Sequence, residues 1–438
     1  MIKKIKCLSF TICLLLIFGS SLMARDWYVS VAKGKGKKGT KVKPAKDLGN
    51  IISKLVGGDV VHIAEGVYLG RGKTGSNIIK VPVKIYGGYD QAFTKRDPWG
   101  AHKTILSGYN LTKNYEMWPA LFIDLMKYGG PNSEIVVDGL IVDHAGRNRY
   151  LSEKRSKLIP MADPKTGKNP SPSEGGIAIR VAKSEKFDRG PRWKITVTNN
   201  IVMNTYGNGG SLSVSGYKGS TIIIDNNLVI QNSGSGIFCG SKYHGKAPLP
   251  SFTVTNNTIL FTWDSGMSKG SNIDLDRNAK VTIKNNVLGF ADIYAINNGY
   301  KCKNILLVKN LITGAKKADY MDFDTQMDVE NMVDEAEYLH EDSDENITDA
   351  IKVPVSKDFA LLYGSRVIVD RAKAEANVTA SNSNANALRG MLGLPLQAGK
   401  VKWPKTPVYL NAISIDDAIA AGSKKYKGSF GCSKPVIK

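Results

Sequence analysis

The chain of 438 residues is long enough for one large elongated domain or two compact ones. Hydrophobic residues make up 42% and charged residues 23%, which is ordinary for a folded protein and excludes a chain too polar to bury a core. The formal net charge of +21 predicts attraction to polyanions. No nucleic-acid-binding motif is present, so the expected partner is an acidic polysaccharide or another extracellular polyanion. The alternative is that the lysines only solvate the surface.

The first residues have the pattern of a bacterial secretory signal peptide. Lys3, Lys4 and Lys6 form a positive start, and residues 7–18 form an apolar run that is short for a membrane span. We expect cleavage after Ala24 and a secreted protein in the periplasm, at the cell surface or outside the cell. The alternative is an uncleaved anchor helix. No later stretch is long and apolar enough to span a bilayer.

Cysteines and charges are unevenly placed in the remaining chain. Cys239, Cys302 and Cys432 would remain after cleavage, and an odd number excludes a fully paired disulfide framework. Residues 33–46 carry seven lysines, whereas residues 319–349 carry thirteen acidic residues and no Lys or Arg. We expect the acidic segment to be flexible or solvated, with folding back onto the lysine-rich regions as the alternative.

A repeat is the most informative feature. The pattern apolar-polar-Asn-Asn-apolar occurs four times. The second asparagines of the four copies are Asn200, Asn227, Asn257 and Asn286, and a weaker copy contains Asn310. The spacings are 27, 30, 29 and 24 residues. Alternating apolar residues precede each copy, which predicts a strand with one buried face. Asn tolerates the left-handed backbone conformation, so each pair predicts a sharp corner.

A second strand rich in Gly and Ser follows each corner about half a period later. These strands are expected at residues 209–216, 235–241, 270–276 and 294–298. Each period then forms one coil of a solenoid, and stacked coils would align the asparagines into a hydrogen-bonded ladder. A β-sandwich is the rival fold, but it does not explain a recurring corner dipeptide. The sequence therefore predicts an all-β, right-handed parallel β-helix with an N-terminal cap and an irregular C-terminal region.

The N-terminal hundred residues also resemble secreted parallel β-helix proteins of the pectate-lyase-like superfamily. The resemblance lies in Trp27–Ser30, Gly58–Ile63, Glu65–Tyr68, Ile85–Tyr89 and Thr104–Gly108. It implies a first strand, an amphipathic segment from Asp47 to Leu55 that caps the solenoid, and a closing strand at Lys357–Ser365.

The superfamily includes lyases, hydrolases, phage tailspikes and adhesins, so the resemblance does not give an activity. Polygalacturonase-type hydrolases carry a Gly-His-Gly motif. The nearest segment here is Tyr243-His244-Gly245, which lacks the first glycine. We therefore do not expect that hydrolase chemistry.

One group of residues has the chemistry of a polysaccharide lyase. Such an enzyme needs a cation to neutralise a uronate carboxylate and a base to remove the neighbouring proton. Asp274 and Asp276 fall on one face of a strand, which we expect to face outward, and they are candidate catalytic residues and ligands for Ca²⁺. Arg277 or Lys301 is the candidate base. The alternative is an exposed polar strand with ordinary surface charges.

A second group follows from counting residues after each corner, with Lys242 and His244 added to supply charge. If the corners stack, these residues line one edge of the solenoid, where aromatic rings suit sugars. The candidate substrate-binding residues are Asp143, His144, Tyr206, Lys242, His244, Trp263, Asp292 and Tyr294. The alternative is that Trp263 and the tyrosines pack under turns.

The sequence predicts a signal peptide at residues 1–24, a β-helix at 25–320, an acidic segment with closing strands at 321–370 and a C-terminal extension at 371–438. We expect a monomer that binds acidic polysaccharide along its flank, in adhesion or at the cell envelope. The alternative function is a polysaccharide lyase that cleaves uronic-acid glycans by β-elimination. No organic cofactor is expected, and Ca²⁺ is the one candidate ion.

Overall fold

The structure is a computed structural model. It describes residues 24–68, 70, 75–107, 119–143, 175–182, 192–203, 205–207, 209–263, 270–349, 351, 353, 414–426 and 430–437. At Ser107, Tyr206, Gly207, Ser233, Trp263, Val333 and residues 422–426 only the backbone is described. The signal segment up to residue 23, His144 and the closing strand expected at Lys357–Ser365 lie outside these ranges. No helix among the described residues has the length and apolar character needed to cross a bilayer.

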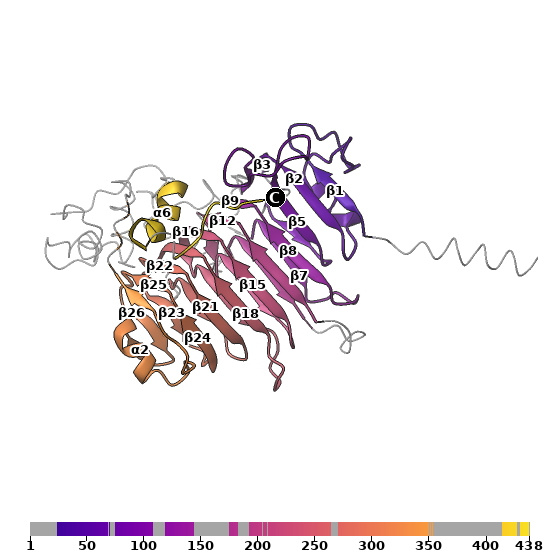
Figure 1. Ribbon diagram of the computed structural model, residues 1–438. Helices are drawn as coiled ribbons and strands as arrows, with labels where there is room; N and C mark the ends of the chain where they lie inside the picture. The colour runs from indigo at the N-terminus through magenta and orange to yellow at the C-terminus, as the bar shows by residue number, and fades with distance from the viewer. Residues whose placement is uncertain are drawn as a thin grey trace, which may run out of the picture.

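Three long sheets run side by side along a solenoid (Figure 1). Sheet A contains, in spatial order, β1 (Asp26–Val29), β2 (Val60–Ala64), β5 (Lys84–Tyr89), β8 (Glu134–Asp138), β11 (Lys194–Thr198), β15 (Thr221–Asp225), β18 (Ser251–Thr255), β21 (Lys280–Lys284) and β24 (Asn304–Val308). Sheet B contains β3 (Gly66–Tyr68), β6 (Thr104–Ser107), β9 (Ile141–Asp143), β12 (Ile201–Met203), β16 (Leu228–Gly234), β19 (Thr258–Trp263), β22 (Val287–Gly289), β25 (Leu311–Thr313) and β28 (Ile347–Thr348), and β13 (Tyr206–Gly207) also pairs with β16. Sheet C contains β4 (Asn77–Ile79), β7 (Leu121–Leu125), β10 (Ile177–Val181), β14 (Leu212–Gly216), β17 (Ile237–Ser241), β20 (Ile273–Leu275), β23 (Tyr294–Asn298), β26 (Ala318–Asp322) and β27 (Thr325–Met327).

Each coil contributes one strand to each sheet, and strands from successive coils pair in parallel. The final β26–β27 pair is antiparallel. Equivalent side chains stack inside the solenoid: Ile195, Ile222, Phe252, Val281 and Ile305 form one fully buried row of sheet A. Burial of such a side chain contributes roughly 1.5–3 kcal/mol. The predicted parallel β-helix is confirmed.

The predicted asparagine corners are confirmed as well. The first residue of each pair adopts the left-handed conformation, as at Asn226, whose φ is 51°. The second asparagines are buried and hydrogen-bonded from coil to coil, and this asparagine ladder runs through Asn200, Asn227, Asn257, Asn286, Asn310 and Asn346. The ladder satisfies backbone groups that the turn would otherwise leave unpaired in the interior.

A cap closes the N-terminal end of the solenoid. Two short 3₁₀ turns, η1 (Leu48–Asn50) and η2 (Ile52–Lys54), bury Leu48, Ile51 and Leu55 against the core. The preceding loop pairs with β1, since the Ala45 N–H donates to the Tyr28 carbonyl at 2.8 Å. The amphipathic segment therefore caps the solenoid as expected, but as 3₁₀ turns.

The acidic segment forms the opposite cap. Helix α2 (Val329–Glu335) follows β27 and packs Val329 and Met332 into the core. The chain after it pairs with β24, because the His340 N–H donates to the Ile305 carbonyl at 2.7 Å. Most acidic side chains of the segment are exposed, which agrees with the expectation of a solvated segment. The alternative of a contact with the lysine-rich region is wrong, since β1 and α2 lie at opposite ends of the solenoid (Figure 1).

The C-terminal part of the chain covers the outer face of sheet B. Helix α6 (Ile415–Tyr426) buries Ala418 against apolar side chains that point outward from β16, β19 and β22. Residues 430–437 then cross the asparagine corners, where Ser433 exchanges two hydrogen bonds with the Asn226 side chain, at 2.8 and 3.0 Å. The chain end thus becomes part of the solenoid wall.

Candidate functional site

A surface pocket lies where the strands of sheet C end, and we call it the Arg277 pocket. Its volume is about 390 Å³. It is lined by Gly209, Phe238, Ser241, Lys242, His244, Asp276, Arg277 and Tyr300. Most of these residues belong to the ends of β17, β20 and β23 or directly follow them. Since parallel strands end at the same edge of a sheet, three successive coils build one site.

Backbone pairing fixes the position of this pocket. The Asp276 N–H donates to the Cys239 carbonyl at 3.0 Å, which continues the β17–β20 pairing by one residue. In return, Asp276 Oδ2 accepts a hydrogen bond from the Ser241 N–H at 3.1 Å. The Lys242 N–H donates to the Gly216 carbonyl at 2.9 Å. The charged residues at the pocket therefore follow strand ends that are themselves held in register.

The pocket combines positive charge with aromatic surface. Lys242, His244 and Arg277 are exposed, and Asp276 is half-buried. The Tyr300 side chain is 44% exposed. Arg and Lys side chains bind carboxylates and sulfates by charge-assisted hydrogen bonds, and a partly exposed tyrosine offers an apolar ring with a polar tip. The arrangement suits an anionic ligand that also has apolar faces.

Asp274 is placed differently from the expectation. Its neighbours Ile273 and Leu275 point into the core, so Asp274 points outward, yet it is only 1% exposed. It accepts hydrogen bonds from the Ser235 hydroxyl and from Asn297 Nδ2, the latter at 2.8 Å. Asp274 therefore points outward as expected, but it is buried, whereas the expectation needed it open to a Ca²⁺ ion or a substrate.

The carboxylates of Asp274 and Asp276 were the candidate Ca²⁺ ligands. They lie two positions apart on the edge of sheet C. Within the described part of the chain, no three His, Cys, Asp or Glu side chains gather in a group suited to a metal ion. Ca²⁺ takes six to eight oxygen ligands, so these two carboxylates would need backbone carbonyls, water or a ligand's own oxygens to complete a site.

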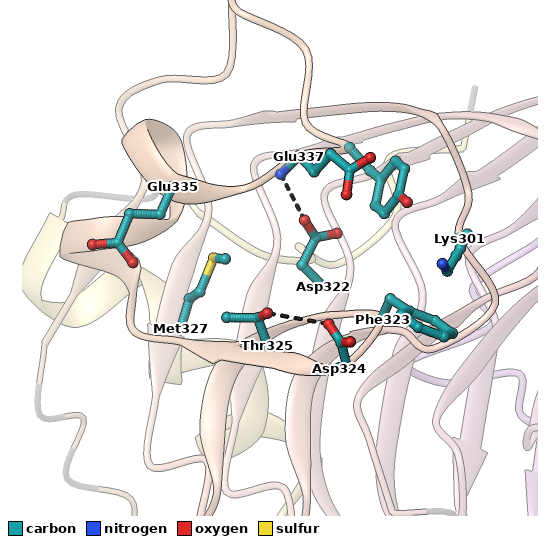
Figure 2. Close-up of a pocket in the computed structure, with 9 residues that line it drawn as sticks. Lys301, Asp322, Phe323, Asp324, Thr325, Met327, Glu335 and Glu337 are labelled. Carbon is teal, nitrogen blue, oxygen red and sulfur yellow. Dashed lines mark hydrogen bonds between the residues drawn. The ribbon is translucent and has the colours of Figure 1, made fainter.

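Lys301 lies in a neighbouring pocket and not beside Asp276. This cap pocket has a volume of about 290 Å³ and is lined by Lys301, Asp322, Phe323, Asp324, Thr325, Met327, Glu335, Glu337 and Tyr338 (Figure 2). The Lys301 ammonium lies 3.6 Å from the centre of the Phe323 ring. Of the two candidate bases, only Arg277 therefore lies in the same pocket as Asp276.

The predicted aromatic edge is present as a row of backbone positions. Tyr206 is in register with Ser233, which is in register with Trp263. The Asp292 N–H donates to the Thr262 carbonyl at 2.9 Å and so extends the row.

Asp292 and Tyr294 are buried, and Asp143 lies outside the aromatic row. Asp292 is 6% exposed, and its Oδ1 lies 2.7 Å from the Lys316 ammonium. Tyr294 is 8% exposed and packs against Ala318. Asp143 is in register with Met203, three positions before Tyr206. The structure thus brings Lys242 and His244 to Asp276 and Arg277, and not to the aromatic row.

The sequence reasoning missed Phe238, Ser241 and Tyr300. A signal was available in the Gly- and Ser-rich second strands. Lys242 and Arg277 come one or two residues after β17 and β20, and Tyr300 comes two residues after β23. Alignment of the coils on these strand ends, instead of on the asparagine corners, would have grouped the pocket residues.

Comparison with known proteins gives distant similarity in structure alone. No family model matches the sequence, and no relative is found among curated proteins. Among solved structures, XylC in complex with xylose is 12% identical with a TM-score of 0.37, covering 67% of this chain and 63% of that chain. A GH136 lacto-N-biosidase from Eubacterium ramulus is 11% identical with a TM-score of 0.34, covering 74% of this chain and 67% of that one. A rhamnogalacturonan lyase is 12% identical with a TM-score of 0.28, covering 93% and 100%. This chain thus spans less than two thirds of the XylC chain, and no activity is transferred to it from these proteins.

Proposed function

We propose that the protein binds an acidic polysaccharide at the Arg277 pocket, in a role in adhesion or at the cell envelope. The observation that carries the proposal is the convergence of Lys242, His244, Arg277 and Tyr300 on one pocket. Each of these side chains is exposed. The two permanent cations outnumber the single carboxylate of Asp276, so an anion is favoured over a cation.

The chemistry of a uronate residue matches these groups. Its carboxylate would accept hydrogen bonds from the Arg277 guanidinium and the Lys242 ammonium. Its ring carries apolar C–H faces that pack against an aromatic side chain, and Tyr300 supplies one at the mouth of the pocket. A sulfated sugar would meet the same two cations. The pocket faces the flank of sheet C, where a long chain can pass without entering a closed cavity.

Calorimetric titration with defined oligosaccharides tests this proposal. We expect binding of oligogalacturonate, oligoalginate, chondroitin sulfate or heparin fragments, and none of a neutral glycan of the same length. Arg277→Ala and Tyr300→Ala should each weaken binding at least tenfold. Lys280→Ala is the matched control, since Lys280 is exposed at the start of β21 on sheet A. Equal affinity in all three variants would exclude this site.

β-Elimination is the second candidate function, because His244 lines the same pocket as Lys242 and Arg277. Arg277 and Lys242 would stabilise the negative charge that develops on the uronate carboxylate. His244 would take the proton from C5, the C4–O bond would break, and the leaving oxygen would take up a proton as a C4–C5 double bond forms. The new double bond absorbs in the ultraviolet. Incubation with the same glycans, with Ca²⁺ or with a chelator, measures it, and His244→Ala should abolish the signal while binding remains.

Export is a further part of the proposal and rests on the first 24 residues. Fractionation of cells that express the full chain, followed by N-terminal sequencing of the mature protein, tests both secretion and cleavage after Ala24. A product that starts at Met1 and stays in the cytoplasm would contradict it.

A further inference from the structure

The two ends of the solenoid carry opposite charge. The loop before η1, here called the lysine loop (residues 33–46), contains seven lysines, and all seven side chains are exposed. It contains no acidic residue. Within the described residues, none of these lysines forms an ion pair with a carboxylate. The lysine loop is therefore a dense positive surface.

The opposite end is strongly negative. The acidic cap (residues 318–349) has no Lys or Arg, and most of its acidic side chains are exposed. The exposed acidic residues are Asp324, Asp328, Glu330, Asp334, Glu335, Glu337, Glu341, Asp342, Asp344 and Glu345. Lys309 pairs with Glu345 at 3.0 Å. The remaining excess of negative charge destabilises the folded cap unless further counter-charges approach.

The acidic cap also contains a pocket whose lining suits a lysine side chain. Figure 2 shows Asp324, Glu335 and Glu337 on different sides of the cap pocket, with Lys301 at one end. Phe323 is 40% exposed at its rim. A lysine side chain has an apolar stem and a charged tip, so it fits a pocket with aromatic walls and carboxylates. The one resident cation, Lys301, does not balance the three exposed carboxylates.

The two charged ends cannot meet within one molecule. Each sheet has nine or ten strands, and a spacing of about 4.8 Å between strands separates the ends by roughly 40 Å. Figure 1 shows β1 and β2 at one end and β26 and α2 at the other. The edge strands themselves are covered, β1 by residues 39–45 and β24 by residues 339–344. Contact between ends would therefore be made by side chains.

We propose that the acidic cap receives the lysine loop of a second copy of this chain, so that molecules associate end to end. A head-to-tail contact of this kind uses two different surfaces and leaves one of each free, so it extends into an open row of solenoids. It uses the cap pocket and not the Arg277 pocket, although the two are neighbours, since Tyr300 lines one and Lys301 the other. The contact is made by exposed charges, so it should be strongest at low ionic strength.

Sedimentation velocity of the full chain at 20 mM and 500 mM NaCl tests the proposal. We expect the weight-average mass to rise with protein concentration at low salt and to fall to that of the monomer at high salt. The triple variant Lys35→Glu, Lys37→Glu, Lys38→Glu should remain monomeric at low salt. So should the variant Asp324→Lys, Glu335→Lys, Glu337→Lys. Each should raise the dissociation constant at least tenfold.

Two controls make the result specific. The variant Lys280→Glu, Lys284→Glu, Lys303→Glu changes the net charge as much as the lysine-loop variant but on other exposed lysines, and it should still associate. A mixture of the two monomeric variants contains one intact lysine loop and one intact acidic cap, so it should form a complex. Circular dichroism checks that each variant folds, and Lys→Gln and Glu→Gln versions replace any that does not.

Three outcomes would overturn the proposal. The first is a wild-type chain that is monomeric at 20 mM NaCl and 100 µM. The second is a mixture that fails to form a complex, and the third is a control that dissociates like the lysine-loop variant. If the monomeric wild-type chain bound heparin and the lysine-loop variant did not, the loop would be a polyanion site instead.

Discussion

The side-chain amide of Asn227 donates a hydrogen bond to Oδ1 of Asn257, one coil further along the solenoid, with 3.0 Å between the two atoms. The same oxygen accepts the backbone N–H of Asn227 at 2.9 Å. Asn257 in turn donates to the Ile224 carbonyl and to Asn286. One buried side chain therefore serves three coils at once.

Asn257→Ala should lower the free energy of unfolding by about 2–3 kcal/mol, because it removes the acceptor of the buried Asn227 N–H and a donor to the buried Ile224 carbonyl. Urea denaturation measures the change. Asn304→Ala is the control, since that side chain is exposed at the start of β24, and it should stay within about 0.5 kcal/mol of the wild type. Equal effects of the two substitutions would show that the ladder adds no stability.

The left-handed corner at Asn285, whose φ is 57°, gives a second prediction. Asn285→Gly should be nearly neutral, because glycine adopts this conformation without strain. Asn285→Val should destabilise by about 1–2 kcal/mol, because a β-branched side chain clashes there. Thermal unfolding of both variants measures the difference. A valine variant as stable as the glycine variant would contradict the assigned backbone conformation.

At the Arg277 pocket, Asp276→Asn should strengthen binding of an anionic glycan about two- to tenfold. The substitution removes the carboxylate charge that opposes Arg277 and Lys242, while an amide oxygen can still accept the Ser241 N–H. The gain should shrink in 500 mM NaCl, where charges are screened. Calorimetry with the oligosaccharide that binds wild type provides the measurement. Weaker binding would assign Asp276 a direct contact with the ligand.

Glu134 makes the free energy of unfolding depend on pH. Hydrogen bonds from Lys84 and Lys194, at 2.5 and 3.0 Å, lower the pKa of Glu134. Its contribution to stability is present above the pKa of the unfolded chain, about 4.3, and is lost as the pH falls through the lower folded pKa. The side chain is 31% exposed, so Glu134→Gln should cost at most about 1 kcal/mol at pH 7.

That difference should disappear at a pH below the lowered pKa. Urea denaturation of both proteins at pH 7, 5 and 3 follows it, with Glu341→Gln as the exposed control. A difference between Glu134→Gln and wild type that stays constant across this range would point to lost packing and not to the ion pairs.

The three described cysteines should be unreactive in the native protein. Cys239, Cys302 and Cys432 are unpaired and buried. Burial raises the pKa of Cys302 to about 11 and that of Cys432 to about 12, and it raises the pKa of Cys239 as well. Because the thiolate is the reactive form, alkylation at pH 8 should be at least a hundredfold slower than in guanidinium. Peptide mass spectrometry reads each site separately, and rapid native labelling of Cys432 would show that the C-terminal segment detaches.

The corner at Asn199-Asn200 shows why the fold could be predicted from the sequence. Its backbone conformation and its buried amide both depend on the residue type, and the alternating strands on either side give the period. The cap at Asp47–Leu55 was expected from the resemblance of the N-terminal residues to parallel β-helix proteins, although not that it forms 3₁₀ turns. These features depend on residues that lie close together in the sequence.

The Arg277 pocket could be predicted only in part, because it depends on stacking between coils of unequal length. His244 follows β17 by three residues, and it was expected to supply charge beside the aromatic row, which is the wrong set of neighbours. The burial of Asp274 could not be predicted either, because Ser235 and Asn297 come from the two adjacent coils. Alternation gives the direction of a side chain, but not what covers it.

The contact between Ser433 and Asn226 joins residues that are 207 positions apart. During synthesis, the coils around β16 and β19 are complete long before α6 emerges, and their outward apolar side chains face water until then. This protein therefore passes through a stage at which most of its solenoid is folded and the apolar outer face of sheet B is still exposed. A chain truncated before residue 414 would remain at that stage. Its exposed apolar face would make it dependent on chaperones and prone to aggregation.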